Sequence, residues 1–93
     1  MIRHSLKTLS TSTPTLLSPI ATHSGVDITI QNVNETGYIY LGGSAVTSSN
    51  YGYRILPNHA ISIELQGRDS LYAVSSINSM TTAVLMANLE AGQ

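Results

Sequence analysis

Short runs of alternating apolar and polar residues recur along the chain, and Gly, Pro and Asn separate them at strand-length intervals. Successive side chains of a strand point to opposite faces, so the apolar residues of 26–33 share one face, as do those of 60–65. The pattern predicts strands at residues 15–22, 26–33, 38–41, 45–47, 51–56, 60–65, 71–76 and 81–89. We therefore predict an all-β fold, a small antiparallel β-sandwich or jelly-roll-like barrel.

Two of the predicted strands are apolar on both faces. In residues 38–41 tyrosines alternate with Ile39 and Leu41, and in residues 81–89 both parities are partly apolar. A strand that is apolar on both faces has both faces covered. We expect the core to cover one face, and a neighbouring element or another subunit to cover the other.

Residues 1–25 differ in composition from the rest, because Ser and Thr are frequent there and Pro14 and Pro19 interrupt them. Hydroxyl side chains compete for backbone hydrogen bonds and Pro removes a donor, so a helix is disfavoured. We expect an extended N-terminal arm and an edge strand within residues 1–23, and the β-sandwich domain in residues 24–93.

The length of 93 residues indicates one domain, which buries roughly 60 to 65 per cent of its unfolded surface. The chain has no Cys to form a disulfide, so contacts with other subunits are the expected source of extra stability. Cys-free composition fits folding in a reducing cytoplasm, although a secreted chain without its signal would look the same.

Charge and hydropathy argue against several partner classes. Charged residues make up 10% of the chain and the net charge is -1, so there is no basic stripe for a nucleic acid. No apolar run approaches the length of a membrane span, and the N-terminus does not read as a signal peptide. We expect neither a nucleic acid nor a membrane as partner.

The residues that usually carry chemistry are scattered. His4, His23 and His59 lie far apart, without a second ligand at metal-binding spacing. The chain has no Gly-x-Ser-x-Gly elbow, and Gly42-Gly43-Ser44 lacks the Lys of a phosphate loop. We expect no catalytic residue, no cofactor and no metal, and therefore a protein that is not an enzyme.

Tyrosines gather in the middle of the chain. Tyr38, Tyr40, Tyr51 and Tyr53 flank Asn50, and tyrosine combines ring area with a polar tip. Such a cluster fits a platform for a sugar. It also fits contacts between subunits, and we favour the contacts because Tyr is enriched at protein interfaces.

The run YIYLGGSAVTSSNYGYRILPNHAISIEL, followed by DSLYAVSS, resembles a pattern found in small virion proteins of tailed bacteriophages. In those proteins a strand ending in Gly-Gly precedes Val-Thr-Ser-Ser-Asn, an aromatic-Gly-Tyr stretch, a Leu-Pro turn, an alternating strand and Asp-x-Leu-Tyr-Ala. The matching positions are Tyr40–Gly43, Val46–Asn50, Tyr51–Tyr53, Leu56–Pro57, Ile61–Leu65 and Asp69–Ala73. The resemblance covers about the C-terminal three quarters of the chain, and the segment before Ser24 carries little of it.

The resemblance implies a virion component that acts in capsid decoration, in head-to-tail connection or as a minor tail part. We expect a decoration protein, made in the host cytoplasm, that binds the major capsid protein or other virion proteins as an oligomer, with a trimer favoured. The alternatives are a connector or minor tail component, or a tail module that binds a glycan through Asn50, Tyr51 and Tyr53. The residues expected at partner interfaces are Ile2, Leu6, Leu9, Tyr38, Tyr40, Tyr51, Tyr53, Val84 and Met86.

Overall fold

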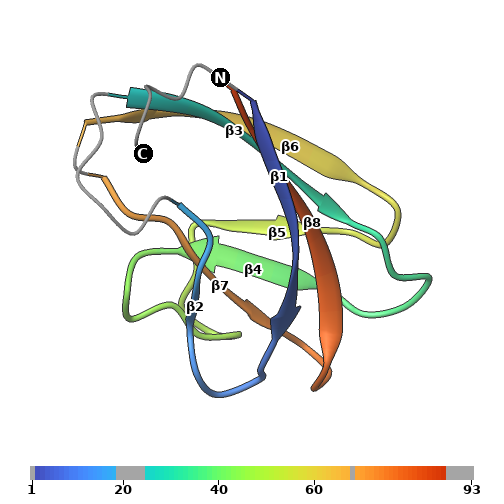
Figure 1. The fold of residues 1–93 in the computed structure, drawn as a ribbon. Coiled ribbons are helices and arrows are strands. Elements are labelled where there is room, and N and C mark those ends of the chain that lie inside the picture. The colour runs from blue at the N-terminus through green and yellow to red at the C-terminus, as the bar shows by residue number, and fades with distance from the viewer. Residues whose placement is uncertain (1, 19–24, 68, 88–93) are drawn as a thin grey trace.

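The computed structural model describes residues 2–18, 25–67 and 69–87, and it confirms the all-β prediction. Eight strands and no helix occur in these residues. The strands are β1 (Arg3–Leu9), β2 (Thr15–Leu16), β3 (Gly25–Asn32), β4 (Ile39–Gly42), β5 (Tyr53–Ile55), β6 (Ala60–Gln66), β7 (Tyr72–Ser75) and β8 (Met80–Ala87). They form two layers, a first sheet in the order β1-β8-β3-β6 and a second in the order β2-β7-β4-β5 (Figure 1).

The strand order is that of a jelly roll. Antiparallel pairs form between β1 and β8, β2 and β7, β3 and β6, and β4 and β5, as in one long hairpin with β4 and β5 at its tip. Rolling up this hairpin also places β8 beside β3 and β7 beside β4. An eight-stranded, two-sheet arrangement of this kind is the architecture shared by many capsid and lectin domains.

The core lies between the two sheets and follows the predicted alternation. In β3 every second residue from Val26 to Asn32 is buried, and the residues between them are more exposed. In β8 the buried parity is that of Met80 and Val84. The core consists of Leu9, Leu17, Val26, Ile28, Ile30, Ile39, Leu41, Ile55, Leu65, Leu71, Ala73, Met80, Val84 and Met86.

The N-terminal segment differs from the expected arm. Residues 3–9 form β1, which pairs with β8 along its whole length, from Arg3 opposite Met86 to Leu9 opposite Met80. Backbone pairing satisfies the polar groups of the β8 edge whatever side chains β1 carries, which explains why a Ser- and Thr-rich stretch is a strand here. Leu9 is buried in the core, so this segment is an integral part of the sandwich.

Two other predicted strands differ from the expectation, since one is shorter within the described residues and the other is a loop. The strand predicted at residues 15–22 contains only β2 within the described residues, and residues 19–22 lie outside them. The piece predicted at residues 45–47 is a loop, in which Thr47 forms an isolated bridge with Asn50. This loop, residues 43–52, packs on the outer side of the second sheet.

The loop of residues 43–52 covers the outer face of β4. Tyr40, Val74 and Tyr72 point outward from the second sheet and pack with Val46 of the loop. Tyr40 is only 9% exposed as a result. We expected a neighbouring element or another subunit to cover the apolar outer face of β4, and the loop of the chain itself covers most of it.

A buried amide at the end of β3 joins the loop between β3 and β4 to the strand β5. Asn32 is fully buried, and its Nδ2 donates to the carbonyl oxygens of Gly37 at 3.1 Å and Ile55 at 3.2 Å. Its Oδ1 accepts from the backbone N of Asn34 at 3.1 Å and from Asn34 Nδ2 at 2.8 Å. Asn34 in turn bonds the backbone of Thr81 in β8. The side chain of Asn32 thus uses both donors and both acceptor positions of its amide.

Candidate functional site

Four of the residues expected at partner interfaces are buried. Leu9, Val84 and Met86 lie in the core, and Tyr40 lies beneath the loop of residues 43–52. This corrects the expectation that they contact a partner. The two parities of β8 were assigned the wrong way round, because its outward apolar side chain is Leu85.

The first exposed group lies on the outer face of the first sheet. In the register His4 is opposite Leu85, which is opposite Thr29, and Leu6 is opposite Ala83. Leu6 is 70% exposed and Leu85 is 43% exposed. We call this surface the aliphatic face, and it consists of the outward residues His4, Leu6, Thr29, Gln31, Ala83 and Leu85. Ile2, also 70% exposed, immediately precedes β1.

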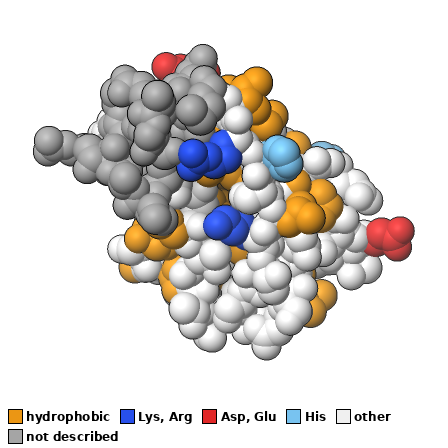
Figure 2. Space-filling view, in the orientation of Figure 1, with side chains coloured by type: hydrophobic (Ala, Val, Ile, Leu, Met, Phe, Trp, Pro, Cys, Tyr) orange, Lys and Arg blue, Asp and Glu red, His pale blue; other side chains and the backbone are white. Residues whose placement is uncertain are grey.

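The aliphatic face contains a shallow groove of about 210 Å³. Its lining residues are His4, Ser5, Leu6, Thr29, Gln31, Ala83, Val84 and Leu85. None of them is Lys, Arg, Asp or Glu. In Figure 2, Lys and Arg side chains lie near the middle of the view, and Asp or Glu side chains lie at its edges. The outer face of the first sheet does carry two exposed carboxylates outside the groove, Asp27 and Glu64, which are register partners. Exposed aliphatic side chains around an uncharged groove are typical of a surface that binds protein.

The edge of β1 is less suited to pairing than this face. β1 is the end strand of the first sheet among the described residues. Lys7 shares the inward parity of its partner Thr82, which is buried. An inward-pointing charge on an edge strand discourages the addition of another strand. A partner of the first sheet is therefore expected to contact its face.

The second exposed group lies on the outer face of the second sheet. The Tyr40 and Tyr51 rings pack at a centroid distance of 4.7 Å with a tilt of 46°. Arg54 is the register partner of Tyr40, and its guanidinium carbon lies 4.8 Å from the centroid of the Tyr38 ring. We call these four residues the tyrosine–arginine patch. Tyr38 and Tyr51 are 38% and 42% exposed, so two rings and one cation are open to solvent.

Tyr53 does not belong to this patch. In the register it pairs with Leu41, whose side chain is in the core. Adjacent strand residues point to opposite faces, so Tyr53 faces away from Arg54. Tyr51, which precedes β5, and Tyr53, the first residue of β5, therefore lie on separate surfaces.

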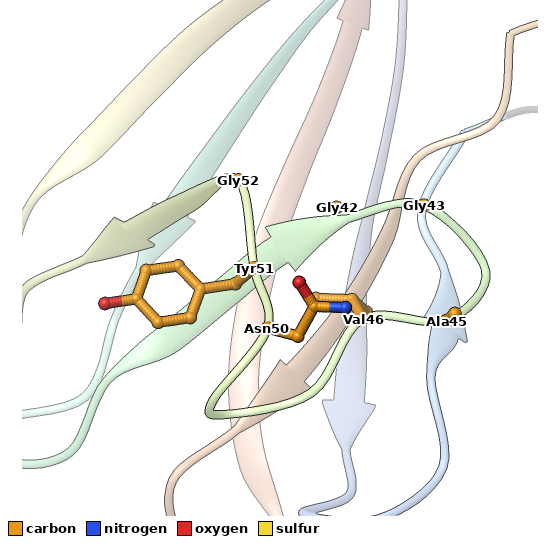
Figure 3. A pocket seen from close by; sticks show the side chains of 7 residues that line it. All are labelled: Gly42, Gly43, Ala45, Val46, Asn50, Tyr51 and Gly52. Carbon is orange, nitrogen blue, oxygen red and sulfur yellow. The ribbon is translucent and has the colours of Figure 1, made fainter.

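A hollow of about 350 Å³ lies beside the patch. Its lining residues are Gly42, Gly43, Ala45, Val46, Asn50, Tyr51 and Gly52. Figure 3 shows the amide of Asn50 directed toward Val46, whereas the ring of Tyr51 points away from Val46. The three residues expected to bind a glycan, Asn50, Tyr51 and Tyr53, are therefore not brought together on one surface.

The loop around this hollow is closed by its own hydrogen bonds. Val46 N donates to Gly43 O at 3.1 Å, and Gly52 N donates to Leu41 O at 2.8 Å. Thr47 Oγ1 accepts from the backbone N of Asn50 at 2.9 Å. A loop held in this way presents its side chains in a defined arrangement.

The histidines and carboxylates considered as metal ligands do not gather at one site among the described residues. No three His, Asp or Glu side chains come together as a metal site in residues 2–18, 25–67 and 69–87. His59 Nδ1 hydrogen bonds to Pro57 O at 2.8 Å, as expected for a loop histidine, and His23 lies outside the described residues. None of the described residues belongs to a helix that could cross a membrane.

Sequence reasoning missed Leu85 and Arg54. The alternation of apolar residues in β8 contained the signal for Leu85, but it did not say which parity faces the core. Arg54 is one of four Lys and Arg residues in the chain, and its position between tyrosines was the available signal.

No family model, no curated protein and no solved structure matches this chain. The jelly roll serves many unrelated functions, so the fold alone does not select one. The function has to be argued from the two exposed surfaces.

Proposed function

We propose that the chain is a non-enzymatic structural protein of a bacteriophage virion, which decorates the outer surface of the capsid. The resemblance of residues 38–76 to small virion proteins of tailed phages supports the virion assignment. The aliphatic face is the observation that carries the docking role. It offers exposed leucines around a groove that no charged residue lines, on a sheet that packs against the core.

The aliphatic face suits a capsid shell made of protein. Burial of exposed Leu6 and Leu85 stabilises the contact by the hydrophobic effect, at about 25 cal/mol per Å² of apolar area. The polar groups beside them on β3, Thr29 and Gln31, supply hydrogen bonds at the rim of such a contact.

The protein acts as an oligomer in this proposal, with a trimer as the expected form. A small domain without disulfides gains stability from subunit contacts. Each subunit then makes a modest contact with the shell, and the linked contacts hold together through their effective concentration. Native mass spectrometry of the purified chain measures the subunit number, and a monomer at micromolar concentration would contradict this part of the proposal.

The copy number in purified virions tests the proposed location. A decoration protein is present at a ratio to the major capsid protein that the shell symmetry allows over the whole surface. A ratio that corresponds to a single ring or to a few copies would instead support the connector or minor tail alternative. Absence of the chain from purified virions would overturn the virion role altogether.

Substitutions on the aliphatic face test the docking surface. We expect Leu6→Gln and Leu85→Gln to lower binding to empty shells in co-sedimentation, because both side chains would otherwise be buried in the contact. Ile77→Gln is the matched control, since Ile77 is 50% exposed in the turn between β7 and β8, away from this face. Equal binding of all three variants would exclude the aliphatic face as the contact.

A further inference from the structure

The outer face of the second sheet carries a cation that is held in place by a ring. The guanidinium carbon of Arg54 lies 4.8 Å from the centroid of the Tyr38 ring. Arg54 forms no ion pair with any of the described residues, so its five N–H donors are available to a ligand. A guanidinium that is held over a ring keeps its planar fork open for two parallel hydrogen bonds to a carboxylate.

The surroundings of Arg54 are ordered before any ligand binds. Tyr38 is fixed by two hydrogen bonds with Ser76: its backbone N donates to Ser76 Oγ at 2.8 Å, and its carbonyl oxygen accepts from Ser76 N at 2.9 Å. The Tyr51 ring packs on the buried Tyr40. A ligand therefore meets rings that have already lost much of their conformational freedom, which reduces the entropic cost of binding.

The neighbouring loop adds hydroxyl and amide groups. Residues 47–50 read Thr-Ser-Ser-Asn, and all four are exposed. The Asn50 amide makes no hydrogen bond to the described residues. No charged side chain lines the hollow beside it, so Arg54 is the single fixed charge among the described residues of the patch and the hollow.

From this arrangement we propose that the tyrosine–arginine patch binds a saccharide that carries a carboxylate, such as a uronic or sialic acid unit. The carboxylate pairs with the guanidinium of Arg54, the C–H face of the sugar ring packs on the Tyr51 ring, and the sugar hydroxyls face the exposed hydroxyl groups of residues 47–49. The two sheets differ in a way that supports this assignment. The groove on the first sheet is bordered by exposed leucines and no charge, whereas the second sheet offers rings, hydroxyls and one cation without an ion pair to the described residues.

The site differs from the glycan site expected from the sequence. It uses Arg54 and Tyr38 in place of Tyr53, and it requires an acid group on the sugar. It also lies on the opposite sheet from the aliphatic face, so sugar binding and shell binding are independent. One activity can fail in an experiment while the other remains.

Binding to paired saccharides tests the proposal. The probes are oligosaccharides that contain glucuronic acid or sialic acid, each compared with its carboxyl methyl ester, in titration calorimetry with the full chain. We expect binding of the acid forms and little or no binding of the esters. Arg54→Gln should weaken binding of the acid forms about tenfold to a hundredfold, because it removes a charge-assisted pair.

Matched variants separate the site from general electrostatics. Arg3→Gln removes the same charge from exposed β1 and should leave binding unchanged. Tyr51→Phe should keep most of the affinity and Tyr51→Ala should lose it, since the ring and not its hydroxyl packs on the sugar. Far-UV circular dichroism of each variant confirms that the fold is intact.

Several results would overturn the proposal. Binding of the esters as tightly as the acids, unchanged binding of Arg54→Gln, or no binding to any acidic saccharide would each do so. Equal binding of free acetate would show a simple anion site. Tighter binding of a glutamate-rich peptide that competes with the sugar would assign the patch to a protein partner instead.

Discussion

Replacement of Asn32 by alanine tests how much the buried amide network contributes to stability. The substitution leaves the carbonyl oxygens of Gly37 and Ile55 without the donors they have at 3.1 and 3.2 Å. It also removes the acceptor of two hydrogen bonds from Asn34. The side chain is fully buried, so the unpaired groups lie largely out of reach of water.

The expected loss follows from these unpaired groups. A buried polar group that loses its partner costs about 1–3 kcal/mol, so two carbonyl groups together lead to a loss of about 3 kcal/mol. A domain of this size has a free energy of unfolding of about 5–15 kcal/mol. The melting temperature should therefore fall by about 15 °C, at roughly 4–8 °C per kcal/mol.

Urea unfolding followed by circular dichroism measures the difference, with Asn78→Ala as the control. Asn78 Oδ1 also accepts two hydrogen bonds, from Thr11 N and Thr11 Oγ1 at 3.0 Å, but it is exposed. Water replaces these bonds, so the control should lose less than about 1 kcal/mol. Equal losses in Asn32→Ala and Asn78→Ala would refute the reasoning. A double-mutant cycle of Asn32 and Asn34 should also show a coupling of about 0.5–3 kcal/mol.

Two further pairs of substitutions test the backbone and the sheet parity. Gly37 has a φ of 89°, and a Cβ there would lie 2.7 Å from Met80 Sδ, so Gly37→Ala should cost about 1–3 kcal/mol. Gly43→Ala, with nothing within 4 Å of its Cβ, should be close to neutral, and similar melting temperatures for the two variants would contradict this account. Val84→Ala should cost about 2 kcal/mol as a buried deletion, whereas Leu85→Ala on the same strand should stay within about 0.5 kcal/mol. A reversed order in denaturant midpoints would mean that β8 presents its other face to the core.

Local alternation was sufficient to predict the fold class and several strands. The residues predicted at 26–33 and 60–65 correspond to β3 and β6, because each has one apolar parity and flanking turn residues. Tight turns at short intervals also left no room for a helix. These features are readable from neighbouring residues alone.

The N-terminal strand was not readable in this way. Residues 3–9 carry Ser, Lys and Thr among few apolar residues, so they show no apolar face of their own. They are a strand because the edge of β8 pairs with them along its length. That pairing joins segments near the two ends of the described chain, so the pattern of neighbouring residues does not indicate it.

The orientation of β8 and the coverage of β4 were likewise decided by distant partners. Both parities of β8 are apolar, and the register with β3 determines that Val84 lies opposite the core residue Ile30 while Leu85 lies outside. The outer face of β4 is covered by Val46, one apolar residue within a loop that otherwise looks hydrophilic. A side-chain pattern of period two distinguishes the two faces of a strand but does not say what each face meets. That depends on contacts between segments far apart in the chain, so the exposed surfaces on which function rests became visible only in the assembled sandwich.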